Sequence, residues 1–199
     1  LGRAELLHLV PRAAVDTADA VDRVRPLVDD VRERGEAALR EQARDFDGIE
    51  GHPLRVPAEQ IADSLRSCPP EIRAALEALI ERLRRASAAQ VPESRTTCFA
   101  DGATITQRWQ PVSRVGLYAP GGKAAYPSSV LMNAVSAQVA GVASLALASP
   151  AQHDNAGRPH EAVLWAAALV GVDEVYAIGG AGAIAAFAYG ERSPILDGN

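Results

Sequence analysis

Residues 116–133 read "GLYAPGGKAAYPSSVLMN", and this stretch decides the expected fold. A short apolar segment ends in a glycine-rich loop, which leads into a segment with the composition of a helix. The same order recurs twice, with "SLALASP" (144–150) before "HEAVLWAAALVG" (160–171) and "EVYAIGG" (174–180) before "AGAIAAFAYG" (181–190). Continuous apolar strands separated by helices predict parallel strands with right-handed crossovers. We therefore expect a Rossmann-like parallel βα sheet.

The sequence before this sheet predicts helices. The stretch "TADAVDRVRPLVDDVRERG" (17–35) has an apolar stripe at helical spacing, and Gly35 is expected to interrupt it before a second helix. The stretches 57–68 and 69–90 predict two further helices. The segment "LRVP" (54–57), which follows the first two helices, is strand-like. From about residue 96, alternating Thr, Ile and aromatic residues broken by Gly and Pro indicate strands and turns.

These patterns divide the chain into two expected parts. Residues 1–95 form an N-terminal helical segment, and residues 96–199 form a Rossmann-like α/β domain. Because three βα units make a thin open sheet, we expect this domain to be incomplete.

The composition is that of a globular protein, with 48% hydrophobic and 23% charged residues. A net charge of −5 supplies no general attraction for nucleic acid or for an anionic membrane surface. Cys68 and Cys98 lack metal-site spacing, so we expect two unpaired thiols in a reducing compartment. No apolar run has the length of a bilayer span. We expect a soluble, cytoplasmic protein with neither nucleic acid nor membrane as a partner.

The loop after the first parallel strand is the first candidate site. Ligands of parallel α/β sheets bind outside the carboxyl ends of the strands. Gly121 and Gly122 let the backbone approach a ligand, and Tyr118 places a ring and a hydroxyl at the mouth of the loop. Ser128 or Ser129 is expected to cap the next helix, whose amides attract anions. A tight βα turn with a capped helix explains the same residues.

The glycine cluster of residues 179–182 is the second candidate site. Gly180, Gly182 and Ala185 match G-x-G-x-x-A, the pattern that cradles phosphate in dinucleotide-binding folds. Such a pattern normally opens the first βα unit, whereas this one opens the third, so close packing of the helix on its strand explains it equally well. His153 and His160 lie in a polar loop without partners at metal spacing, and we expect a solvated connection there.

Three segments together resemble the amino-terminal half of the histidinol dehydrogenase family. They are "VRERGEAALREQARDFDG" (31–48), "RWQPVSRVGLYAPGGKAAYPSSVLMNAVSAQVAGV" (108–142) and "GVDEVYAIGGAGAIAAFAYG" (171–190), and the resemblance runs over about residues 15–190. It implies a cytoplasmic, homodimeric oxidoreductase of histidine biosynthesis that requires zinc. Such an enzyme oxidises L-histidinol to L-histidine by two successive hydride transfers to NAD.

The resemblance also implies roles for individual residues. Tyr118 corresponds to a tyrosine that contacts NAD, and Asn199 corresponds to an asparagine that does so. Gly182 stands where the family has a third NAD contact, a glutamine, so the match to the glycine fingerprint arises from that replacement. The zinc ligands and the catalytic acid and base are expected outside this chain, which is then inactive alone.

Two alternatives stay open at this point. One is a truncated, non-catalytic homologue that acts as a binding or interaction module, which the loss of the glutamine favours. The other is an unrelated Rossmann-type oxidoreductase that uses the literal glycine fingerprint.

Overall fold

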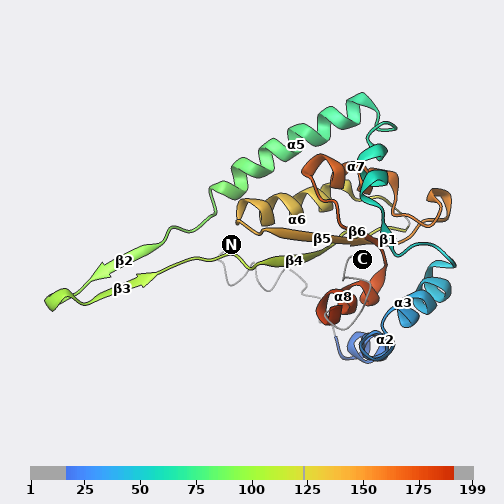
Figure 1. Cartoon of the computed structure of the whole chain (residues 1–199), viewed down its shortest axis with the longest axis horizontal. Helices are drawn as coiled ribbons and strands as arrows, with labels where there is room; N and C mark the ends of the chain where they lie inside the picture. Colours follow the sequence, from blue (N-terminus) through green and yellow to red (C-terminus); the bar gives the residue numbers. More distant parts are fainter. Residues whose placement is uncertain (1–16, 123, 191–199) are drawn as a thin grey trace, which may run out of the picture.

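The sheet has parallel strands flanked by helices on both faces, as Figure 1 shows for the computed structural model, which describes residues 17–122 and 124–190. Strands β4 (Arg114–Tyr118), β5 (Ser144–Ser149) and β6 (Val175–Ala177) are parallel and adjacent, with Leu117 opposite Leu147 and Ala148 opposite Tyr176. The predicted parallel α/β sheet is confirmed.

A fourth strand comes from the N-terminal part of the sequence. Strand β1 (Arg55–Val56) pairs antiparallel with β6, so the sheet order is β1-β6-β5-β4. The strand-like "LRVP" stretch is therefore an edge of the main sheet. Helices from before residue 95 also cover this sheet, while the division into parts at residues 1–95 and 96–199 stays a prediction.

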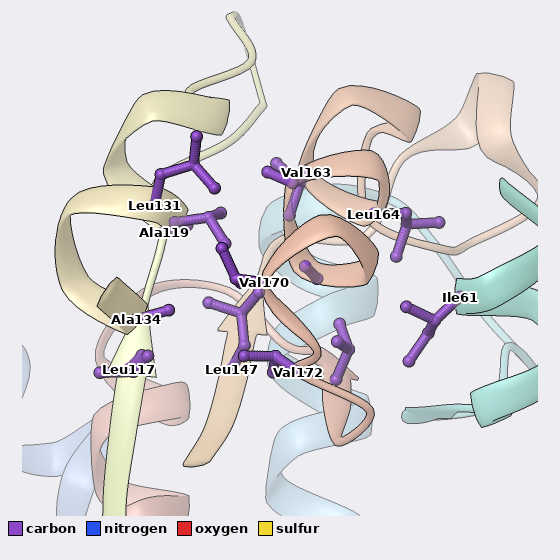
Figure 2. Packing of buried hydrophobic residues seen from close by; sticks show 14 of the residues in the cluster. Ile61, Leu117, Ala119, Leu131, Ala134, Leu147, Val163, Leu164, Val170 and Val172 are labelled. Carbon is purple, nitrogen blue, oxygen red and sulfur yellow. The ribbon is translucent and has the colours of Figure 1, made fainter. Parts of the chain in front are cut away.

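On one face of the sheet lie α6 (Pro127–Val139) and α7 (Glu161–Val170), and α4 (Ala58–Ser64) and α5 (Pro70–Ala88) pack against these two helices (Figure 1). Their apolar side chains meet those of the strands in the larger core cluster, part of which is drawn in Figure 2. Leu131 of α6, Val163 of α7 and Leu147 of β5 are fully buried there. Burial of such aliphatic side chains is the main stabilising contribution to the fold.

The other face is covered by α2 (Ala18–Arg34), α3 (Glu36–Gln42) and α8 (Gly180–Tyr189). Gly35 separates α2 from α3 with φ of 56°, as predicted from the sequence. A π-helical turn, η1 (Ala43–Asp47), follows α3. The predicted stripe of α2 is buried only toward its end, where Val31 joins the second core cluster, whereas Val21 and Val24 stay exposed.

Helix α8 packs directly on the backbone of β4. A Cβ atom at Gly116 would lie 2.6 Å from Cγ and Cδ2 of Phe187, so the ring of Phe187 occupies the space over a glycine in the strand. Phe187 also meets Tyr176 edge-on, with ring centroids 6.1 Å apart. These contacts fix the last turn of α8 against the middle of β4 and against β6.

A two-stranded hairpin extends away from the body of the molecule (Figure 1). Strands β2 (Arg95–Cys98) and β3 (Thr104–Gln107) pair antiparallel around a 3-10 turn, η2 (Ala100–Gly102). The predicted strands and turns of this region are present, but all residues of both strands are exposed. Within the described part of the chain, nothing else packs against this hairpin in Figure 1.

Candidate functional site

The two glycine-rich loops of the sequence meet at the carboxyl end of the sheet. Pro150, directly after β5, lies between them: a Cβ atom at Gly121 would be 3.1 Å from its Cδ, and one at Gly179 would be 3.3 Å from its Cβ. Side chains at either glycine would press on the proline ring. The small residues therefore allow the loops after β4 and β6 to close around the end of the central strand.

Tyr118 links these two loops by a hydrogen bond. The backbone amide of Gly180 donates to the phenolic oxygen of Tyr118 at 3.1 Å. Gly179 is the N-cap residue of α8 and has no side chain that can accept from the first turn. The Tyr118 hydroxyl supplies that acceptor from the neighbouring loop.

A buried polar atom lies beneath the first loop. The Oγ atom of Ser149, the last residue of β5, has no hydrogen-bond partner among the described residues, although the side chain is 1% exposed. A Cβ atom at Gly121 would lie 3.3 Å from this oxygen. Buried hydroxyls are normally hydrogen-bonded, so an unpartnered one at a ligand-binding edge indicates room for another polar group.

Helix α6, which follows the glycine-rich loop after β4, begins differently from the prediction. Helix α6 has Tyr126 as its N-cap residue and begins at Pro127, and no side chain makes a capping hydrogen bond there. The prediction that Ser128 or Ser129 caps this helix is wrong, because Pro127 already occupies the first helical position and places both serines inside the first turn.

A cavity of about 290 Å³ opens beside the start of α8. Its inner wall is the backbone of Gly179, Gly180 and Ala181 together with Ile178, and α3 and the turn η1 form the opposite wall. Most of the lining is apolar, and the polar side chains are Gln42 and Asp47. Burial raises the pKa of the Asp47 carboxyl, against the opposing attraction of His52 and His153.

Gly182 faces α3 rather than open space. A Cβ atom at this position would lie 2.5 Å from Oε1 of Gln42 and 3.1 Å from Cδ2 of Leu39. Gln42 is held there because its Nε2 donates to the carbonyl oxygen of Leu27 at 3.1 Å. The space that a side chain at residue 182 would fill is thus occupied by the amide of Gln42.

The two histidines of the polar loop are explained by their local structure. His160 is the N-cap residue of α7, and its Nδ1 accepts from the amide of Ala162 at 3.1 Å. His153 is exposed on a short 3-10 turn, η3 (His153–Asn155). Across the ranges 17–122 and 124–190, no three His, Cys, Asp or Glu side chains gather as a metal site would require. Asn199 lies outside the described residues.

The comparison with known protein families places the chain in a family. The family model for histidinol dehydrogenase matches residues 10–195.

The chain belongs to the histidinol dehydrogenase family.

Its relatives include the histidinol dehydrogenases of Bifidobacterium longum, 55% identical over 193 residues, and of Leifsonia xyli, 56% identical over 188 residues. These matches cover 96% and 94% of this chain but only 41% and 43% of the relatives. The crystal structure of histidinol dehydrogenase from Elizabethkingia anophelis aligns with a TM-score of 0.84 and 25% identity, over 96% of this chain and 43% of that one. The chain thus spans about two fifths of the length of its relatives.

Membership of the histidinol dehydrogenase family excludes one of the two earlier alternatives. An unrelated Rossmann-type oxidoreductase is excluded, and the resemblance seen in the sequence is confirmed. Among the described residues, no helix is long and apolar enough to cross a membrane.

Several residues of the site were not singled out from the sequence. Ser149 and Pro150 carry a usable signal, because they end a predicted parallel strand next to a glycine loop. Gln42 and Asp47 carry none, because they belong to a helical segment whose polar residues are typical of a solvated face. Their approach to the start of α8 depends on how α3 is placed over the sheet.

Proposed function

We propose that this chain is the NAD-binding part of a histidinol dehydrogenase, which oxidises L-histidinol to L-histidine with NAD and zinc in the cytoplasm as a homodimer. The observation that carries the proposal is the hydrogen bond from Gly180 to Tyr118, which joins the two candidate loops in one site. This site lies at the carboxyl end of parallel strands, where such sheets bind nucleotides.

The residues present fit a nucleotide cofactor. No atom of the described residues lies within 4 Å of the Cβ positions of Gly122 and Gly180, so a ligand can approach both backbones closely. The unpartnered hydroxyl of Ser149 adds a polar group at the same edge. When bound, NAD supplies the acceptor for the hydride that leaves the substrate carbon.

In this proposal the chain's own residues position the cofactor. Tyr118 holds the start of α8 in place and presents its ring, which is half-buried, at the mouth of the loop. Asn199 is proposed as a further NAD contact. No group of three side chains that could bind zinc occurs within the described residues.

The test is NAD binding and turnover by the natural full-length protein. We expect calorimetry to show NAD binding, and we expect NADH to form when L-histidinol and zinc are added. Replacing Tyr118 by Ala removes both the ring and the acceptor for Gly180, and we expect NAD affinity to fall about tenfold or more. A full-length protein that does not bind NAD would contradict the proposal.

The second candidate is a non-catalytic homologue that acts as a binding or interaction module. The observation that favours it is Gly182, at the position where the resemblance implies a glutamine that contacts NAD. NAD binding without NADH formation from L-histidinol would support this candidate, and turnover would exclude it.

A further inference from the structure

We propose that Gln42 reads a planar ring of the dinucleotide inside the cavity beside α8, in the place of the side chain that Gly182 lacks. The inference rests on the proposed function, because it assigns part of the same NAD site. The ring is one with a hydrogen-bond donor and acceptor side by side, which both ends of NAD carry: the edge of adenine and the carboxamide of nicotinamide.

The cavity has the size and lining for one ring. Its volume of about 290 Å³ is at the lower end of the range for small-molecule sites, so it suits one nucleoside half rather than the whole dinucleotide. Apolar side chains surround it, including Val24 of α2, Leu39 of α3 and Ile178, which directly follows β6. Such a lining favours a flat neutral ring.

A phosphate group is a poor occupant of the same cavity. The Asp47 carboxylate is part of the wall, and its Oδ2 lies 3.3 Å from the Cβ position of Gly179, next to the first residue of α8. This negative charge opposes the attraction that the start of a helix exerts on anions. The wall therefore favours a base over the pyrophosphate.

Gln42 has the groups that such a ring needs. One N–H of its amide is used by the carbonyl of Leu27, which leaves a second N–H, and Oε1 has no donor within the described ranges of the chain. A glutamine amide with a free donor and acceptor pairs with an adenine edge through two hydrogen bonds, and it pairs with a carboxamide in the same way. The residue is half-buried and lines the cavity, so a ligand can reach it.

Two exposed apolar residues border the same space. Phe46 is 67% exposed and Val24 is 40% exposed, and both line the cavity. Covering large, solvent-exposed apolar side chains with a ligand ring removes them from water, which stabilises the complex. This exposure is independent of the Gln42 geometry and indicates the same occupant.

The test compares four forms of the natural full-length protein for binding of NAD, AMP and nicotinamide mononucleotide. Gln42→Leu keeps the volume but removes the donor and acceptor. Gln60→Leu is the matched control, because Gln60 is exposed on α4 and does not line this cavity. Gln42→Ala combined with Gly182→Gln moves the amide from α3 to α8 and frees the space that it needs.

We expect Gln42→Leu to weaken NAD binding about tenfold, since it removes two hydrogen bonds of ordinary strength. Gln60→Leu is expected to bind like the wild type, and the double variant is expected to recover to within about threefold. The mononucleotide that loses affinity in parallel identifies the ring: AMP indicates adenine, and nicotinamide mononucleotide indicates the carboxamide.

The experiment distinguishes a wrong assignment of Gln42 from a wrong proposed function. If the wild type binds NAD and Gln42→Leu binds it equally well at unchanged folding stability, the assignment of Gln42 is wrong while the proposed function stands. If the wild type binds no NAD, the proposed function fails, and the assignment fails with it.

Discussion

The Gly180 amide and the Tyr118 hydroxyl are 3.1 Å apart, so the last residue of β4 caps the helix that follows β6. The two residues are far apart in the sequence, and the central strand β5 lies between their strands in the sheet. Because the cap comes from the end of another strand, it ties the position of the glycine-rich loop after β4 to the stability of α8.

The first prediction concerns this cap. Tyr118→Phe keeps the ring but leaves the Gly180 amide without its acceptor, and we expect the free energy of unfolding to fall by about 1 kcal/mol. Urea denaturation measures the loss. Tyr126→Phe is the control, because Tyr126 is exposed and no hydrogen bond of its hydroxyl occurs among the described residues. Equal stabilities for both variants would show that the Tyr118 hydroxyl does not cap α8.

The second prediction concerns the contact between α8 and β4. Gly116→Ala introduces a methyl group 2.6 Å from the ring of Phe187, and we expect a loss of about 1–3 kcal/mol because helix and strand must separate. Phe187→Leu is expected to relieve part of this overlap. Thermal unfolding of both single variants and the double variant gives the coupling energy, and strictly additive losses would contradict a direct contact.

The third prediction compares two neighbouring residues of α6. Leu131 is fully buried in the larger core cluster, and Leu131→Ala is expected to cost about 2–5 kcal/mol through lost burial and the cavity left behind. Met132 is exposed, and Met132→Ala is expected to change stability by about 0.5 kcal/mol or less. Chemical denaturation of the pair checks which face of α6 is buried, and similar losses would refute the packing in Figure 2.

The fourth prediction concerns pH. Burial raises the pKa of Asp47 above its usual 3.8, so in the window above 3.8 the folded state binds more protons than the unfolded state. The contribution of this carboxyl to stability therefore falls as pH rises through its folded pKa. Asp47→Asn has no such dependence, and we expect its stability relative to the wild type to increase with pH and then level off.

Denaturant titrations between about pH 3 and pH 7 measure this difference. Asp22→Asn is the control, because Asp22 is exposed on α2, and we expect the wild type and this variant to change in parallel. A stability difference for Asp47→Asn that grows toward acid would have the opposite sign to the prediction.

The parallel strands were predictable because each is a continuous apolar run next to an apolar helix. The antiparallel edge was not, because β1 consists of Arg55 and Val56 alone, and its pairing with β6 depends on distant residues. A strand of two residues has no periodicity of its own. The same limit applies to the hairpin, where the alternation predicts strands but does not predict that both faces are exposed.

The candidate site was predictable in part. Both glycine loops follow strand ends, so their place at one edge of the sheet follows from the topology. The bond between Tyr118 and Gly180 was not predictable, since it depends on the relative lengths of β4 and β6. Gln42 was not predictable for a different reason. On an amphipathic helix, a polar residue that lines a cavity has the same sequence pattern as one that faces water.

The pairing of β1 with β6 also constrains how the chain folds during synthesis. Arg55 is opposite Tyr176, so the edge strand leaves the ribosome long before its partner, on the order of ten seconds earlier at ordinary rates of translation. During this interval the apolar faces of helices α2 to α5 stay exposed, because the strands and helices that bury them are synthesised later. Contacts of this sequence separation slow folding, so the nascent chain exposes apolar surface, and with it a risk of aggregation, for longer than a chain with local pairing.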